Sequence, residues 1–366
     1  MQNSLSPSIS QKLANMGFVC ALFVVSIHVV YKQEVTPADA QWWVAALLAD
    51  GISHIAVPFF FVVAGFLLGG HVTEPGWWAR EIRKRIRSLV LPFFAWSILF
   101  AIFFLGSTVI ANVLSGVPLS RNIPEYWWWS FWNFGILESP PYNVLWFIRT
   151  LFVFILLSAP LVWVMQKGRI WLSGLTLILL VAYLWTLPFP QKEGISPVEF
   201  IFGWMGILST RSLFAFFLGL FLRLHPIQKK PSTWICWLIL LLGLGCFCLR
   251  RVCLDWETSR WLTGSLDAVG IWLSLYATWY LMTARPWPKF ITSLAFPLFL
   301  VHPFVIIALG IMMRWLQALP TLTPCASYLS RTAFVIMISV GIIIPFRHAF
   351  PKLSAFLFGG RGLTKK

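Results

Sequence analysis

Charge is scarce in this sequence, and negative charge is scarcer than positive charge. Only 11% of the 366 residues are charged, with 12 acidic residues against 28 lysines and arginines, whereas 59% are hydrophobic and the mean hydropathy is +0.80. A soluble domain carries about a quarter charged residues. The shortage of charge therefore excludes a soluble fold and predicts a chain that lies mostly in a lipid bilayer.

The sequence also lacks the signals of several other classes. Its first apolar run has no small-residue cleavage site after it and little positive charge before it, which predicts a retained helix rather than a signal peptide. There is no nucleic-acid-binding module and no pair of self-similar halves. The six cysteines lack paired metal spacing, so we predict packing roles and no metal site for Cys20, Cys236, Cys246, Cys248, Cys253 and Cys325.

Long apolar runs are abundant. Runs of about 17 to 25 residues suit helices that cross a bilayer, and short polar or proline-bearing segments separate them. We predict an all-α integral membrane protein, one domain over residues 1–366, built as a polytopic bundle of about ten transmembrane helices. Their expected ranges are 13–31, 50–70, 88–110, 143–166, 170–187, 200–223, 232–249, 261–283, 290–312 and 331–347.

The net charge of +16 comes from basic residues that gather where alternate spans end. By the positive-inside rule, this asymmetry places both termini in the cytoplasm. We interpret most of these residues as anchors to anionic lipid headgroups rather than as a nucleic-acid surface. The cluster at residues 80–87 is also a candidate phosphate dock, with Arg85 the foremost candidate beside Arg83 and Arg87.

Histidines inside apolar spans are candidate functional residues, because a polar ring is costly in hydrocarbon unless it pairs or does chemistry. His28 ends the first run, where it either joins two helices or acts on a substrate. His302 lies about twelve residues into its span, roughly 18 Å deep, and is either structural or substrate-positioning. His54 has the same two alternatives, the structural one being a pair with Asp50 one turn away.

Two arginines, Arg149 and Arg211, are also predicted inside spans or at their ends. A guanidinium there needs an anion. The candidates are an anionic acceptor or an internal partner, namely Glu138, Glu199 or Asp267. The aromatic cluster at residues 126–132 is predicted to lie at the membrane interface, with a stacking platform for a sugar as the alternative.

Seven blocks of sequence, in order, resemble the acyltransferase-3 family of bacterial inner-membrane O-acyltransferases. They are residues 16–28, 57–67, 84–97, 145–160, 216–219, 293–303 and 351–361. The family pattern has an Arg eleven positions before the first-helix His and an Arg-x-x-Arg on the inner face. Here Gly17 and Ser88 stand at two of those arginine positions, so two basic residues that the family pattern implies for donor binding are absent.

The resemblance implies an enzyme that moves an acyl group, an acetyl group in the simplest case, from cytoplasmic acyl-CoA to a hydroxyl of a cell-surface glycan or its lipid-linked precursor. Neutral His, with an ordinary pKa of about 6.5, suits the role of base for that hydroxyl, and His28 is our candidate. We assign substrate positioning to His302, His54, Arg149 and Trp146.

Two alternatives to this enzyme remain open from the sequence. One is a transporter or flippase for a polyprenyl-linked sugar, and the other is a catalytically degenerate relative, for which Gly17 and Ser88 are the argument. The residues do not indicate the acceptor, the acyl chain length or the oligomeric state.

Overall fold

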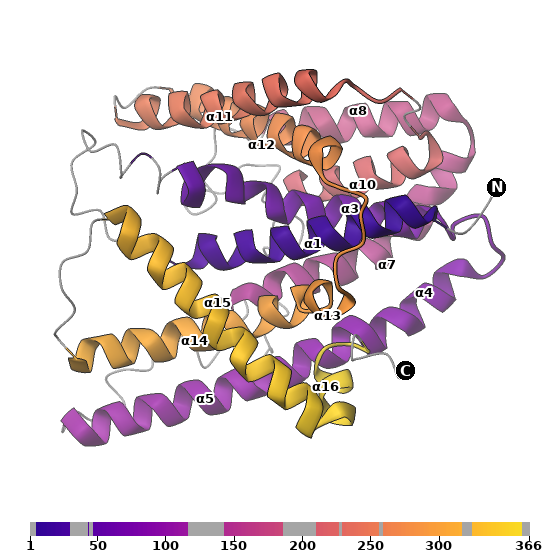
Figure 1. Ribbon diagram of the computed structural model, residues 1–366. Coiled ribbons are helices and arrows are strands. Elements are labelled where there is room, and N and C mark those ends of the chain that lie inside the picture. Colours follow the sequence, from indigo (N-terminus) through magenta and orange to yellow (C-terminus); the bar gives the residue numbers. More distant parts are fainter. Residues whose placement is uncertain are drawn as a thin grey trace.

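The computed structural model describes residues 5–29, 43, 47–115, 143–185, 210–226, 229–255, 259–316 and 324–360. Within these ranges every regular element is helical (Figure 1). The elements are α1 (Pro7–His28), η1 (Leu47–Gly51), η2 (Ile52–Ile55), α3 (Ala56–Gly69), α4 (Trp77–Arg85), η3 (Ile86–Val90), α5 (Leu91–Ser115), η5 (Asn143–Leu145), α7 (Trp146–Gln166), α8 (Arg169–Trp185), α10 (Thr210–Leu224), α11 (Thr233–Asp255), α12 (Arg260–Leu281), α13 (Lys289–Thr292), α14 (Ala295–Leu316), α15 (Pro324–Ala349) and α16 (Pro351–Leu357).

Each of the ten predicted ranges overlaps a described helix, although the first ten residues of the range 200–223 lie outside the described residues. Six helical segments are long and apolar enough to cross a membrane: Pro7–His28, Leu47–Gly69, Trp77–Ser107, Trp146–Val164, Thr233–Cys253 and Tyr328–Ala349. Shorter apolar helices cover Ser173–Leu184 and Ala295–Gly310. The chain is therefore a multi-pass membrane protein.

Large apolar side chains on the outside of the bundle fit a lipid environment. Ile170 is 80% exposed and Ile102 is 65% exposed, although water would disfavour both. A bilayer leaves no water to satisfy backbone polar groups, so the helix is the element that these apolar runs adopt. At the start of α1, Ser6 accepts a hydrogen bond from the Ile9 amide, and Pro7 opens the first turn.

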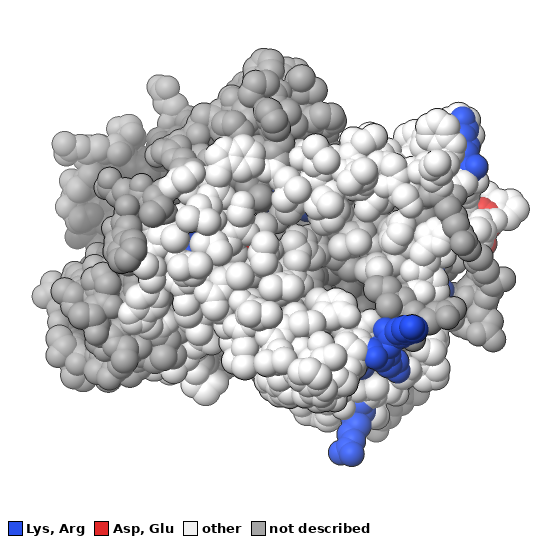
Figure 2. Space-filling view, turned by 90° about the horizontal axis from the view of Figure 1, so that it is seen from above, with Lys and Arg blue, Asp and Glu red and all other residues white. Residues whose placement is uncertain are grey.

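One end of the bundle gathers the start of α1 and the C-terminal α16. The Asn15 amide of α1 donates to the carbonyls of Thr283 (3.1 Å) and Arg285 (2.9 Å), just after α12. Arg347, near the end of α15, donates to the Ser293 hydroxyl (2.9 Å) and carbonyl (2.8 Å), just before α14. Figure 1 marks both termini at this end, which we call the basic end. On the face seen in Figure 2, lysines and arginines gather mainly there.

Helices α3 and α10 approach closely because each carries a glycine at the crossing. A Cβ atom on Gly65 would lie 1.8 Å from the Phe216 carbonyl oxygen, and one on Gly219 would lie 1.9 Å from that of Val62. Small residues at such crossings let membrane helices pack backbone to backbone. This crossing fixes α3 against α10, and it therefore also fixes the start of α3, which directly follows η1 and η2.

Replacing Gly65 or Gly219 with Ala is expected to destabilise the protein by about 1–3 kcal/mol or more, because α3 and α10 must separate to admit the methyl group. Thermal unfolding in detergent measures the effect. Gly106→Ala in α5 is the matched control, since a Cβ there meets nothing within 4 Å. Equal melting temperatures for the three variants would show that the close crossing is wrong.

Candidate active site

His28 lies in the last turn of α1, and the backbone of its own helix fixes its tautomer. The ring Nδ1 is 2.8 Å from the Val24 carbonyl oxygen. A carbonyl only accepts hydrogen bonds, so in the neutral ring Nδ1 carries the proton and Nε2 keeps its lone pair. The ring is half-buried rather than sealed. His28 therefore offers a basic nitrogen on a residue that is only partly buried.

His302 repeats this arrangement on α14. Its Nδ1 lies 2.9 Å from the Leu298 carbonyl oxygen, which again leaves Nε2 with the lone pair. The residue is fully buried, and Nε2 has no hydrogen-bond partner among the described residues. A buried acceptor without a donor is costly, so its retention is typical of a functional position.

The fold brings the two histidines together. Their ring centroids are 5.1 Å apart, with the ring planes at 66°. The sequence marked both residues separately, but it gave no sign that they touch. Their helices pack against each other over much of their length. Nearer the basic end, the Phe18 ring of α1 contacts the Trp287 ring, which precedes α13, with 6.4 Å between the ring centroids.

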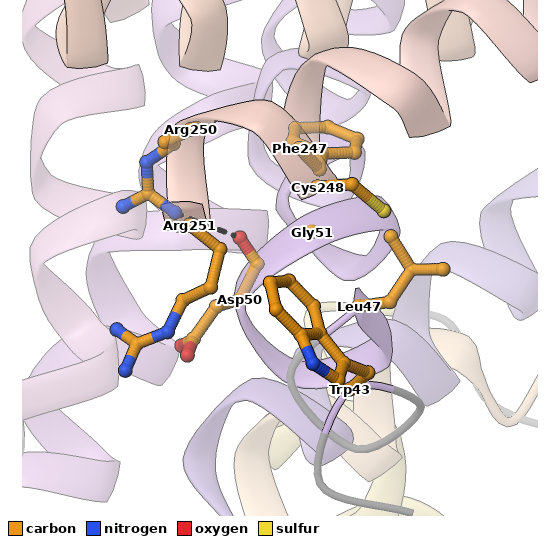
Figure 3. Close-up of a pocket in the computed structure, with 8 residues that line it drawn as sticks. All are labelled: Trp43, Leu47, Asp50, Gly51, Phe247, Cys248, Arg250 and Arg251. Carbon is orange, nitrogen blue, oxygen red and sulfur yellow. Dashed lines mark hydrogen bonds between the residues drawn. The ribbon is translucent and has the colours of Figure 1, made fainter. Parts of the chain in front are cut away.

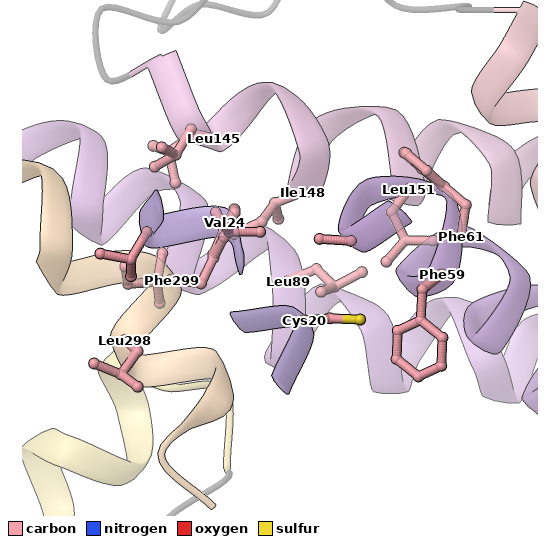
Figure 4. Packing of buried hydrophobic residues seen from close by; sticks show 14 of the residues in the cluster. Cys20, Val24, Phe59, Phe61, Leu89, Leu145, Ile148, Leu151, Leu298 and Phe299 are labelled. Carbon is pink, nitrogen blue, oxygen red and sulfur yellow. The ribbon is translucent and has the colours of Figure 1, made fainter. Parts of the chain in front are cut away.

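Apolar side chains from four elements surround the turn that precedes His28. Figure 4 shows Val24, one turn before His28, among Leu145 of η5, Ile148 of α7, and Leu298 and Phe299 of α14. All five are buried members of one hydrophobic cluster. This packing fixes the position of the α1 turn that carries the His28 ring.

A hydroxyl network that the sequence did not reveal ties the His28 turn to two other elements. The Ser26 hydroxyl donates to the Phe23 carbonyl (2.8 Å), so in its contact with Ser53 of η2 (2.7 Å) the Ser53 hydroxyl is the donor. The Tyr328 hydroxyl of α15 donates to the Ser26 carbonyl at 3.1 Å. The sequence signal for this network was hydroxyl residues inside apolar runs.

His54 lies outside the pair, in a neighbouring charged group. The predicted pair with Asp50 is not formed as a hydrogen bond, and the charges that act on His54 belong to Asp267, Arg250 and Asp50. Arg250 Nε lies 3.5 Å from the Asp267 carboxylate, and Arg250 Nη1 donates to the Asp50 carbonyl at 3.3 Å. The sequence did not lead us to single out Arg250. Its charge at the end of an apolar run could have marked it as a residue that needs an acidic partner.

Arg149 and Trp146 lie at the start of α7, next to the cluster around Val24. Arg149 is buried, at 8% exposure, and Trp146 contacts the rings of Phe61 (6.2 Å between centroids) and Phe147 (6.3 Å). Asp267, one of the internal partners considered for Arg149 and Arg211, forms an ion pair with Arg250. Arg211 and Asp267 both lie near Tyr183.

Several predicted features lie outside the described residues. They are the aromatic cluster at residues 126–132 and the proposed partners Glu138 and Glu199. Among the described residues, no group of three His, Cys, Asp or Glu side chains could hold a metal ion. Five cysteines are free thiols: Cys20, Cys236, Cys246, Cys248 and Cys253.

At the basic end, Arg85 is tied to a carboxylate of its own helix. Glu81 is buried and accepts hydrogen bonds from Lys84 Nζ (3.1 Å) and Arg85 Nε (3.0 Å). Arg83 and Arg87 are exposed and make no ion pair with any described residue. Of the three arginines assigned to donor binding, these two carry uncompensated charge.

The two positions that depart from the acyltransferase-3 pattern differ in the space around them. A Cβ on Gly17 would meet nothing within 4 Å, so this position of α1 has open surroundings. The backbone of Ser88, in η3, is covered by Gly359, where a Cβ would lie 2.3 Å from the Ser88 carbonyl oxygen and where φ is +63°. Only glycine adopts that conformation freely.

Comparison with known proteins finds a family model that matches most of the chain. The sequence model of the Acyltransferase domain family, acyltransferase-3, matches residues 16–348. The succinoglycan biosynthesis protein ExoH of Rhizobium meliloti is 25% identical over 235 residues, which cover 62% of this chain and 57% of that protein. The alignment thus spans less than two thirds of the relative. No solved structure matches the chain.

Ser26→Ala is expected to lower the free energy of unfolding by about 1–3 kcal/mol, because it leaves the buried Ser53 hydroxyl without its acceptor. Ser107→Ala is the matched control, since that hydroxyl bonds to the Phe104 carbonyl of its own helix. Denaturation of both variants in the same detergent measures the difference. A Ser26→Ala variant as stable as Ser107→Ala would show that the hydroxyl network does not hold η2 to α1.

Proposed function

The chain belongs to the acyltransferase-3 family, and we propose from that premise that it is an O-acyltransferase acting on a cell-surface glycan or its lipid-linked precursor. The acyl group is acetyl and the donor is acetyl-CoA. Family membership supports the reaction class. The relative named for succinoglycan biosynthesis supports a polysaccharide acceptor.

The contact between His28 and His302 is the observation that carries this proposal. Acyl transfer to an alcohol needs a base, because an alcohol is a poor nucleophile while protonated. Both rings keep Nε2 as the basic atom, but His302 is fully buried whereas His28 is only partly buried. We therefore assign the base to His28 and substrate positioning to His302.

The reaction then follows from these roles. His28 Nε2 takes the proton of the acceptor hydroxyl while the hydroxyl oxygen attacks the thioester carbonyl carbon. The new C–O bond forms, the C–S bond breaks, and the thiolate leaves with the proton that His28 returns. The products are the O-acyl ester and free CoA, so atoms and charge balance without a metal ion.

The two ends of the bundle suit the two substrates. His28 lies about 24 Å along α1 from Lys12, at 1.5 Å per residue. The histidine is therefore far from the basic end. We place the basic end and both termini in the cytoplasm, within a ten-span topology in the bacterial inner membrane. The donor then enters from the side that holds CoA, and the glycan arrives from the other side.

Arg83 and Arg87 are the proposed phosphate contacts for the donor. Both are exposed and lack an ion-pair partner among the described residues, and a CoA molecule carries several phosphate charges. Arg85 contributes to the same field, but its bond to Glu81 gives it a structural role as well. Membrane lipid headgroups are the other partners of this surface.

Deletion of the gene is expected to remove one O-acyl substituent from the host's surface glycan while the glycan is still made. An allele encoding His28→Ala should show the same loss, with activity lowered about 10²–10⁴-fold. His348→Ala, an exposed histidine of α15, is the matched control and should keep the substituent. Mass spectrometry of purified glycan before and after mild alkali gives the readout.

The other outcomes separate the alternatives. A strain that loses the whole glycan would indicate a flippase, and an unchanged glycan would indicate a degenerate relative. Full acylation in the His28→Ala strain would remove His28 from catalysis while leaving the family assignment intact.

Replacing both Arg83 and Arg87 with Gln is expected to raise KM for acetyl-CoA about tenfold and to weaken its salt dependence, with little change in kcat, because charge at the mouth of a site acts on binding. Lys352→Gln, an exposed cation of α16, is the control. Steady-state kinetics at two salt concentrations test this, and an unchanged KM would place the donor elsewhere.

A further inference from the structure

The seventh block of sequence that resembles the family, residues 351–361, has no part in the reaction described above. In the structure its first residues form α16, which packs against α5 and α15 toward the basic end (Figure 1). Gly359 follows α16 with a φ of +63°. We call residues 351–359 the C-terminal clamp, because they join the start of α5 to the end of α15.

The C-terminal clamp is held by Trp96 of α5 and Arg347 of α15. The Trp96 indole Nε1 donates a hydrogen bond to the Leu357 carbonyl oxygen (2.9 Å), which satisfies a carbonyl at the end of α16. The Phe358 ring centroid lies 6.0 Å from that of Trp96 and 5.7 Å from the Arg347 guanidinium carbon. Phe358 is buried. A buried ring held between an indole and a cation fixes the residue that follows it.

Gly359 brings the C-terminal clamp against the main chain of η3. A Cβ atom on Gly359 would lie 2.3 Å from the Ser88 carbonyl oxygen and 3.0 Å from the Ser88 Cα, so only a residue without a Cβ fits this contact. Ser88 lies in the middle of η3, a π-helical turn between α4 and α5. Turns of this kind are rare inside long helices and are frequent at functional sites.

The turn that Gly359 covers carries Arg87, one of the proposed phosphate contacts. Arg87 directly precedes Ser88 and is exposed. The two residues share one planar peptide unit, so a contact that fixes the main chain of Ser88 also fixes the Cα atom of Arg87. The Ser88 hydroxyl is buried and has no hydrogen-bond partner among the described residues, so the main chain provides the contact.

We propose that the C-terminal clamp positions Arg87 for the phosphates of the acyl donor, an inference that rests on the proposed function. The clamp holds Ser88 through Gly359, and Ser88 holds the main chain of Arg87. An arginine whose main chain is already fixed loses less freedom when it binds an anion, so the donor binds more tightly. Gly359 is thus a positioning residue that acts through Arg87.

The adjacent arginines Arg250 and Arg251 do not compete with this site for the donor. They lie near the end of α11 that is remote from the basic end. The hollow that they line together with Asp50 has room for about one water molecule (Figure 3). Asp267 pairs with Arg250, and the Asp50 side chain points toward the Arg251 guanidinium in Figure 3. A phosphate of CoA would not fit there and would be repelled by the carboxylates.

Gly359→Ala tests the C-terminal clamp, because it adds one methyl group at the contact with η3. We expect KM for acetyl-CoA to rise about three- to tenfold with little change in kcat, since Arg87 is displaced and His28 is not. Calorimetry with CoA on full-length protein in nanodiscs should show the same loss of affinity without turnover. Gly360→Ala is the matched control, because φ there is also positive, at +78°, but a Cβ meets nothing within 4 Å. Its KM should equal that of the wild type.

A second comparison separates positioning from a general loss of structure. In an Arg87→Gln background, Gly359→Ala should have no further effect on KM, because the guanidinium that the clamp positions is gone. A merely structural role would give the same fold change with and without Arg87. If Gly359→Ala does not fold, Phe358→Leu replaces it in this comparison, since that variant stays apolar but loses the ring between Trp96 and Arg347.

The outcomes distinguish this inference from the proposed function. A Gly359→Ala variant with the KM and CoA affinity of Gly360→Ala, or with an effect that does not depend on Arg87, would overturn the clamp while glycan acylation still depends on the gene. Wild-type protein that binds no CoA would overturn the donor site and the clamp together. An unchanged glycan after deletion of the gene would overturn the proposed reaction, while CoA binding that depends on both Gly359 and Arg87 would still support the clamp.

Discussion

The hydrogen bond from each imidazole to the carbonyl one turn earlier is the interaction on which the centre of this protein depends. In hydrocarbon a polar ring must satisfy its donor, and the Val24 and Leu298 carbonyls do so for His28 and His302. The helix thereby selects the tautomer, and the basic nitrogen of each ring is left for other contacts. A local backbone bond thus determines which nitrogen of each ring keeps its lone pair.

The helices could be predicted from the sequence because bilayer thickness sets their length. The same reasoning marked His28 and His302, since each is a polar residue in an apolar run. Their contact could not be predicted, because it depends on how α1 and α14 pack in three dimensions. The ion pair between Asp267 and Arg250 was missed for the same reason: Arg250 comes from the neighbouring helix α11, and opposite charges in two spans do not reveal which of several pairs forms.

Charge separates the described part of the molecule into two regions. The basic end exposes arginines such as Arg83 and Arg87, which suit phosphates and lipid headgroups. The remote end has arginines too, but there Asp50 and Asp267 lie close to Arg250 and leave a polar surface of mixed sign. Counting basic residues located the first region. The second required the fold, because its residues come from helices far apart along the chain.

The bond between Tyr328 and Ser26 joins residues that are 302 positions apart, and the two histidines lie on helices that are almost as widely separated. During synthesis α1 leaves the ribosome long before α14 and α15 do. The two histidines can therefore meet only after the intervening chain has been made and α14 has been inserted. A polypeptide that stops before α14 would lack the histidine pair.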